Sequence, residues 1–319
     1  MFRQLAFKAH ASAPEGPVFV DRWRNQRQLD SILMNGRAVR KPRPLTIKEL
    51  LMSPQPSRPR EPILNLPSAV AISVLVLMGI HLLRMFLEDA TDFQVMVDWG
   101  VVPARWAVAY GGVRAQDIIA ALSPENASDE IMMNYVRYVL GDEDGRPWTA
   151  LSYAFLHGSW AHVLINGVWL AAFGTPMVRR CGAGRYLVLL AASSIGGAVF
   201  YAWMNPTALL PMIGASGAVS GLMAAASWFI FAPATWHQSG RLTQPHERPR
   251  ELLGQMVLNR QVLVFLAVWF AANYLFAFIP LPGTMGAGIA WEAHMGGFLV
   301  GLAIFPFLDP VPPKRRVSA

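Results

Sequence analysis

Four long stretches of this chain are apolar and nearly free of charge, and they constrain its fold more than any other feature. They cover residues 69–87, 163–178, 186–204 and 261–279. A helix that crosses a bilayer needs about 20 such residues. Only 15% of the 319 residues are charged, whereas ordinary soluble domains carry about 25%. We therefore predict an all-α polytopic membrane protein.

The uneven distribution of charge predicts how the chain is oriented in the membrane. Residues 1–67 hold twelve Lys and Arg against five Asp and Glu, and residues 87–147 hold four Arg against eleven acidic residues. Basic segments stay on the cytoplasmic side. The net charge of +7 is thus a sign of topology and not of nucleic-acid binding. Contact of the basic arm with anionic lipid headgroups is a secondary consequence.

Six spans satisfy this charge rule throughout, with both termini in the cytoplasm and the acidic loop 88–149 outside. We expect a basic, Pro-rich cytoplasmic region at 1–67, a membrane domain at 68–307 and a cytoplasmic tail at 308–319. No cleavable signal peptide is expected, because the first apolar run begins near Ser68. The predicted spans are 68–87, 150–174, 186–204, 214–232, 261–280 and 286–307.

The long acidic loop is rich in tryptophan and tyrosine. Such side chains favour the membrane interface, so the loop either lies partly in the outer interface or forms a small external subdomain. The aromatic residues concerned are Trp99, Trp106, Tyr110, Tyr135, Tyr138 and Trp148.

One serine and one histidine stand out within the apolar segments. Ser216 lies in a Gly-Ala-Ser-Gly sequence, and His294 lies in Ala-His-Met-Gly-Gly. Ionisable groups inside a bilayer are costly and usually have a partner or a function, and histidine is the usual base that activates a serine. A helix that starts near Ser216 offers free N–H groups and a positive dipole end, which suit an oxyanion. Taken alone, however, Gly-Ala-Ser-Gly fits helix packing better than catalysis.

His162 and Asn166 are four residues apart, so they share one helix face, and both can donate hydrogen bonds. His162 is predicted about twelve residues into the second span and His294 about eight residues into the sixth, which places both roughly 12–18 Å below the outer surface. Facing Ser216, His162 and Asn166 would hold an oxyanion together with the serine N–H. The alternative is interhelical hydrogen bonding that only fixes the bundle. His157 is expected to face another way.

Small residues recur at every fourth position in the predicted fourth and sixth spans, and they predict close packing of these two helices. They include Gly217, Gly221, Gly297 and Gly301. Close approach is what a hydrogen bond between Ser216 and His294 requires. Glu292 points elsewhere, because two residues correspond to about 200° around a helix. We therefore predict a Ser–His dyad, with His294 oriented by packing rather than by an acid.

These residues together resemble the rhomboid family of intramembrane serine proteases. The resemblance covers roughly residues 148–305. It rests on three motifs in order: His162-x-x-x-Asn166, Gly214-Ala215-Ser216-Gly217, and Gly288-x-x-x-x-Ala293-His294-x-x-Gly297-x-x-x-Gly301.

The resemblance implies a six-helix rhomboid-like bundle around a water-filled cavity, in the inner membrane of a bacterium. It implies Ser216 as nucleophile, His294 as general base, and His162 and Asn166 as oxyanion donors. The implied substrates are single-span membrane proteins, cut in or near their transmembrane segment. No cofactor and no metal are expected.

This chain departs from the family pattern at two positions, which affect how the first external loop is anchored and how His294 is oriented. Many members carry Trp-Arg in the first external loop, where this chain has Trp148 followed by Thr149; some bacterial members place a tyrosine, stacked on the catalytic histidine, where this chain has Ser220. Two rival functions remain open. One is an inactive rhomboid-like protein that binds membrane proteins, and the other is a proton-coupled transporter that uses His162 and His294.

Overall fold

Helices form all the regular structure in the part of the chain that the computed structural model describes. β-type pairing in this part is confined to two isolated bridges. The described residues are 65–122, 126, 128–141, 144–236, 240–277 and 290–311. The helices of the apolar segments are α3 (Ser68–Arg84), α10 (Trp160–Met204), α11 (Ser216–Ser227), α13 (Arg260–Ala277) and α14 (Trp291–Leu308).

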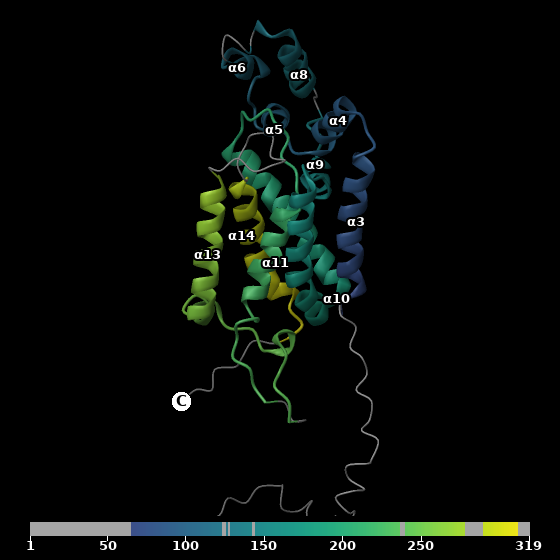
Figure 1. Cartoon of the computed structure of the whole chain (residues 1–319). Coiled ribbons are helices and arrows are strands. Elements are labelled where there is room, and N and C mark those ends of the chain that lie inside the picture. The colour runs from purple at the N-terminus through teal and green to yellow at the C-terminus, as the bar shows by residue number, and fades with distance from the viewer. Residues whose placement is uncertain are drawn as a thin grey trace, which may run out of the picture. The chain divides into compact units, whose positions relative to one another are not determined.

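The short helix α11 occupies the centre of the bundle and packs against both α10 and α14. In Figure 1, α3 and α13 lie at the two edges, α3 beside α10 and α13 beside α14. Every residue of α11 from Gly217 to Ser227 is buried. A helix that is covered on all sides belongs in the interior, and small residues such as Gly, Ala and Ser let its neighbours approach closely.

The helix α10 joins two predicted spans into one 45-residue element that bends at Gly182, where φ is +80°. The turn expected at 175–185 between these two spans is shorter than predicted, because helix continues on both sides up to Gly182, whose positive φ glycine adopts without strain. Each half contains about 22 residues and is about 33 Å long.

The start of α10 also differs from the predicted second span, which began at residue 150. Residues Thr149–Ser152 form a short helix, α9, and Tyr153–Phe155 form the 3₁₀ turn η1. The Ser159 hydroxyl then caps α10 by accepting a hydrogen bond of 3.2 Å from the N–H of His162. His162 consequently lies in the first turn of α10, and the prediction that it stands about twelve residues into its helix is wrong.

Two described helices, α10 and α14, are long and apolar enough to cross a membrane, while α3 and Arg260–Leu275 of α13 are apolar but shorter. The count of six spans stays a prediction. The segment between the predicted fifth and sixth spans, the motif residue Gly288, residues 1–64 and the tail beyond residue 311 lie outside the described residues.

A buried ion pair ties the bend of α10 to the end of α14. Arg180 Nε lies 2.8 Å from Asp309 Oδ1, and both side chains are fully buried. The same guanidinium donates hydrogen bonds to the carbonyl oxygens of His246 and Arg248 and lies over the ring of Phe229. Burying an ion pair is costly unless further hydrogen bonds satisfy it, and this network provides them. Arg180 thus serves the packing of the bundle besides contributing positive charge.

The acidic loop 88–149 contains helices with a small apolar core of their own, which favours a small subdomain over a loop that lies partly in the membrane interface. These helices are α4 (Asp89–Trp99), α5 (Pro103–Tyr110), α6 (Ala115–Ala120) and α8 (Glu130–Leu140). Buried residues of this core include Val97, Val102, Ala104, Ile118, Val136 and Val139. In Figure 1 these helices gather at one end of the bundle.

The Trp148-Thr149 departure leaves this loop well anchored. Thr149 is fully buried; its hydroxyl accepts a hydrogen bond of 3.1 Å from Trp106 Nε1 and donates one of 2.7 Å to the carbonyl of Arg146. Arg146 in turn pairs with the Asp98 carboxylate. Burial alone would raise the pKa of Asp98, but hydrogen bonds from Tyr138, Arg146 and the Gln94 amide outweigh it and lower that pKa. Asp98 therefore remains charged at neutral pH and holds this corner of the loop.

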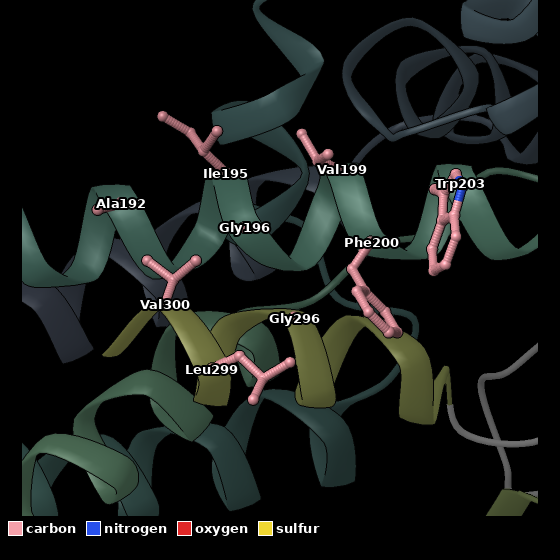
Figure 2. Close-up of a pocket in the computed structure, with 9 residues that line it drawn as sticks. All are labelled: Ala192, Ile195, Gly196, Val199, Phe200, Trp203, Gly296, Leu299 and Val300. Atoms are coloured by element: carbon pink, nitrogen blue, oxygen red, sulfur yellow. The ribbon is translucent and has the colours of Figure 1, made fainter. Parts of the chain in front are cut away.

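Glycines set the distance between α10 and α14. Figure 2 shows Gly196 of α10 and Gly296 of α14 at an apolar groove whose lining includes Phe200 and Trp203. A Cβ added to Gly296 would overlap the carbonyl oxygen of Gly196. The lining of this groove has no nucleophile or base, so the groove is not a catalytic site.

Candidate active site

The turn that leads into α11 is held by hydrogen bonds to the segment before α10. Gly214 has φ +126°, and its N–H donates to the carbonyl of Tyr153 at 2.9 Å. The next N–H, of Ala215, donates to His157 Nε2 at 3.3 Å. Ser216 follows as the first residue of α11 and is half-buried. The predicted helix start at this serine is confirmed, and glycine is required at 214 because L-side chains rarely adopt that φ.

Residues of the 88–149 loop clamp the chain just before this turn. Met212 forms an isolated bridge with Val101, with hydrogen bonds of 3.0 and 2.8 Å. The Tyr135 hydroxyl donates to the carbonyl of Leu209 at 2.6 Å. Burial raises the pKa of Tyr135 to about 12, so the phenol stays protonated and remains a donor. The 88–149 loop thereby fixes the approach to Ser216.

His162 lies directly against the backbone of this turn. A Cβ built on Gly214 would come within 2.8 Å of His162 Cε1 and Nε2. His157 is fully buried beside it, with ring centroids 4.9 Å apart. The expectation that His157 faces away is therefore wrong. The cause is that residues 156–159 are not helical, so five-residue helical spacing does not apply to this pair.

Asn166 lies one turn further along α10 and is buried. Its Nδ2 donates a hydrogen bond of 3.0 Å to the carbonyl of His162. An amide nitrogen has two hydrogens, so this bond uses one of them and fixes the orientation of the amide. His162 and Asn166 are thus on one helix, with the imidazole against Gly214.

The glycine faces of α11 and α14 meet beside the serine. A Cβ on Gly217 would lie 3.3 Å from the carbonyl oxygen of Ala293, the residue before His294, and a Cβ on Gly297 would overlap the carbonyl of Gly217. One turn on, a Cβ on Gly301 would overlap the carbonyl of Gly221. The residues that flank Ser216 and His294 in sequence are therefore in backbone contact.

An asparagine that the sequence reasoning missed contacts the histidine. His294 Nδ1 hydrogen-bonds Asn273 Oδ1, which projects from α13. The expectation that packing orients His294 is thus wrong, because a specific side chain holds the ring. Among the described residues that partner is an amide and not a carboxylate.

Two other side chains near the histidine are engaged elsewhere. The Ser220 hydroxyl donates to the carbonyl of Ser216 at 2.7 Å, within α11. Glu292 accepts a hydrogen bond of 3.3 Å from Asn205 Nδ2, at the end of α10, in agreement with its expected direction. Neither residue orients His294.

Chemically, the site combines a hydroxyl at a helix N-terminus, a histidine on a neighbouring helix and potential hydrogen-bond donors on a third helix. Acyl transfer by a serine needs a hydroxyl beside an imidazole, and the contact of Gly217 with Ala293 brings together the helices that bear Ser216 and His294. The free N–H groups at the start of α11 provide partial positive charge where an oxyanion would form.

Comparison with known proteins identifies this part of the chain. A family model described as the Rhomboid domain matches residues 144–309. Rhomboid protease GlpG of Pectobacterium atrosepticum is 24% identical over 173 residues, which cover 54% of this chain and 52% of that protein. The protein of the same name from Serratia proteamaculans is 27% identical over 193 residues, 60% of this chain and 59% of the relative. The chain thus spans little more than half the length of these curated relatives.

Proposed function

This chain belongs to the rhomboid family, and from that premise we propose that it is an intramembrane serine endopeptidase. The observation that carries the proposal is the contact between α11 and α14 at Gly217 and Ala293, which brings together the helices bearing Ser216 and His294. The match to two proteins named as rhomboid proteases supports it.

The proposed topology has six spans with both termini in the cytoplasm of a bacterium. The helices α3, α11, α13 and α14 supply four spans, and the halves of α10 on either side of Gly182 supply two. The central helix α11 has twelve residues, so irregular backbone before it reaches membrane depth. Such backbone is tolerated where protein surrounds it, and the hydrogen bonds to Val101 and Tyr153 agree with that position. The proposed domain limits remain 1–67, 68–307 and 308–319.

In the proposed mechanism, His294 removes the proton of the Ser216 hydroxyl as the oxygen attacks a substrate peptide carbonyl. The C–O bond forms and the carbonyl π electrons move to its oxygen. When this intermediate collapses, the C=O bond re-forms, the C–N bond breaks, and His294 passes the proton to the leaving amine nitrogen. Water, activated by the same histidine, hydrolyses the acyl-enzyme and restores the serine.

The oxyanion of each tetrahedral intermediate is stabilised by His162, Asn166 and the Ser216 N–H in this proposal. The contact of the His162 ring with Gly214 supports it. Positive charge from the α11 dipole adds to these donors.

The proposed substrates are single-span membrane proteins cut in or near their transmembrane helix. A helical peptide hides its carbonyls, so the segment has to unwind before Ser216 can attack it. Small or helix-breaking residues near the cut lower the cost of unwinding and should be preferred.

Reconstitution tests the function directly. The full chain in proteoliposomes, mixed with a fluorescently tagged single-span substrate, should release a shortened product in a time-dependent manner. The Ser216→Ala variant, reconstituted at equal density, should release none. A folded wild-type protein that cleaves no member of a panel of transmembrane sequences would contradict the proposal.

Asn166→Ala is expected to slow cleavage by up to about a hundredfold, because one oxyanion donor is lost. The effect should fall on kcat, with KM and the thermal unfolding temperature little changed. The measurement is steady-state cleavage of the single-span substrate in proteoliposomes. Unchanged turnover in a folded variant would remove Asn166 from the oxyanion role.

A further inference from the structure

We propose that Asn273 of α13 is the positioning residue that sets the tautomer and direction of His294; the inference rests on the proposed protease function. His294 Nδ1 bonds Asn273 Oδ1, which joins the α14 histidine to a different helix. A histidine base needs one ring nitrogen fixed so that the other presents its lone pair to the nucleophile.

The direction of the Asn273 amide is fixed from the other side. Its Nδ2 donates a hydrogen bond of 2.8 Å to the carbonyl of Trp269, one turn earlier in α13. The reversed amide would place two acceptor oxygens against each other, which offers no hydrogen bond. Oδ1 therefore faces the histidine as an acceptor, so His294 Nδ1 carries the proton.

With the proton on Nδ1, Nε2 of His294 is the basic nitrogen. That is the tautomer needed to accept the Ser216 proton through Nε2. During the reaction, when both nitrogens carry protons, Oδ1 continues to accept from Nδ1 and its dipole favours the transient positive charge. The asparagine takes no proton itself.

Aromatic packing holds α13 in the register that this hydrogen bond requires. The Trp269 ring stacks on Phe298 of α14, with centroids 5.1 Å apart and planes at 24°. Phe270 also contacts Phe298, at 5.9 Å. Phe298 lies one turn after His294, and Trp269 lies one turn before Asn273. The aromatic contact and the hydrogen bond are therefore neighbours in the same interface between α13 and α14.

The hydrogen bond to Asn273 orients His294 in a chain that has Ser220 where some bacterial family members have a tyrosine stacked on the histidine. Ser220 cannot stack on a ring, and its hydroxyl is bonded to the Ser216 carbonyl. Two other titratable groups lie in this region: Glu292, on α14 itself, accepts a hydrogen bond from Asn205, and His162 lies on α10. Among the described residues, Asn273 is the one with a hydrogen bond to the His294 ring.

The test compares Asn273→Ala, Asn273→Asp and the control Val268→Ala, an exposed residue on the same helix, in the proteoliposome cleavage assay. Loss of the hydrogen-bond partner that orients a metal-bound histidine typically costs about 10- to 100-fold. By analogy, we expect Asn273→Ala to lose about that much kcat, with KM within about twofold of wild type. Val268→Ala should retain wild-type kcat.

The Asn273→Asp variant distinguishes a positioning role from a purely structural one, because only a positioning role predicts a change in the pH–kcat profile. A carboxylate accepts the same hydrogen bond, so this variant should recover most of the activity lost in the alanine variant. A negative charge beside His294 favours its protonated form, so the acid limb of the pH–kcat profile should move up by about one unit or more.

Each outcome decides the inference. An alanine variant with wild-type kcat overturns it while leaving the protease intact, and so does an aspartate variant that is folded, inactive and unshifted in pH. If the alanine variant does not fold, recovery and the pH shift in the aspartate variant still decide. Absence of cleavage by wild type overturns the proposed function, and this inference with it.

Discussion

Replacing His294 by alanine is expected to reduce cleavage of a single-span substrate by more than about a thousandfold, because loss of the base leaves the Ser216 hydroxyl a weak nucleophile. The residual rate should come from substrate binding and oxyanion donors alone. The measurement is product formation in proteoliposomes under single-turnover conditions. Folding is checked by thermal unfolding of the same preparation.

The matched control for this variant is His246→Ala. His246 lies in the 3₁₀ turn η2 (Pro245–Glu247), and it is its backbone carbonyl that takes part in the Arg180 network. Removing its side chain should leave cleavage within about twofold of wild type. Comparable loss in both variants would show a general sensitivity to histidine removal, and full activity of His294→Ala would exclude the proposed base.

Replacing Gly297 by alanine is the second change with a large expected effect. The added Cβ would overlap the carbonyl oxygen of Gly217, and neither helix backbone can yield locally. We expect a loss of about 1–3 kcal/mol in stability from overpacking. Moving α14 by about 1 Å would also misplace His294 relative to Ser216, which can cost about a hundredfold in rate.

Gly79→Ala in α3 is the matched control, since a Cβ there meets no atom within 4 Å. It should unfold at or slightly above the wild-type temperature, because alanine favours helix more than glycine does. The comparison uses thermal unfolding in detergent and cleavage in proteoliposomes. Equal behaviour of the two variants would show that close contact of α11 and α14 is not needed.

The sequence predicted the parts of the fold that depend on charge, hydropathy and small-residue spacing. The all-helical character and the helix beginning at Ser216 follow from these patterns, and the structure shows both. Close contact of Gly297 with Gly217 follows from spacing every fourth residue. The catalytic roles of Ser216 and His294 remain predictions.

Two features could not be predicted from the sequence: the start of α10, which depends on local capping, and the partner of His294, which depends on the rotation of α13 about its axis. The start of α10 depends on a Ser159 cap that apolar runs do not reveal, so the position of His162 along its helix was predicted wrongly. Asn273 is a lone polar residue in an apolar run, which is itself a signal of a partner. Identifying His294 as that partner requires knowing which face of α13 meets α14, and one sequence does not provide it.

Labelling with a fluorophosphonate probe tests the central claim most directly, since the probe reacts covalently with an activated serine. Wild-type protein in a membrane or detergent should be labelled, with the adduct located on Ser216 by mass spectrometry. Ser216→Ala and His294→Ala, folded to the same extent, should not be labelled. A folded wild-type protein that never labels, or labelling that persists in Ser216→Ala, would contradict a serine protease built on Ser216 and His294.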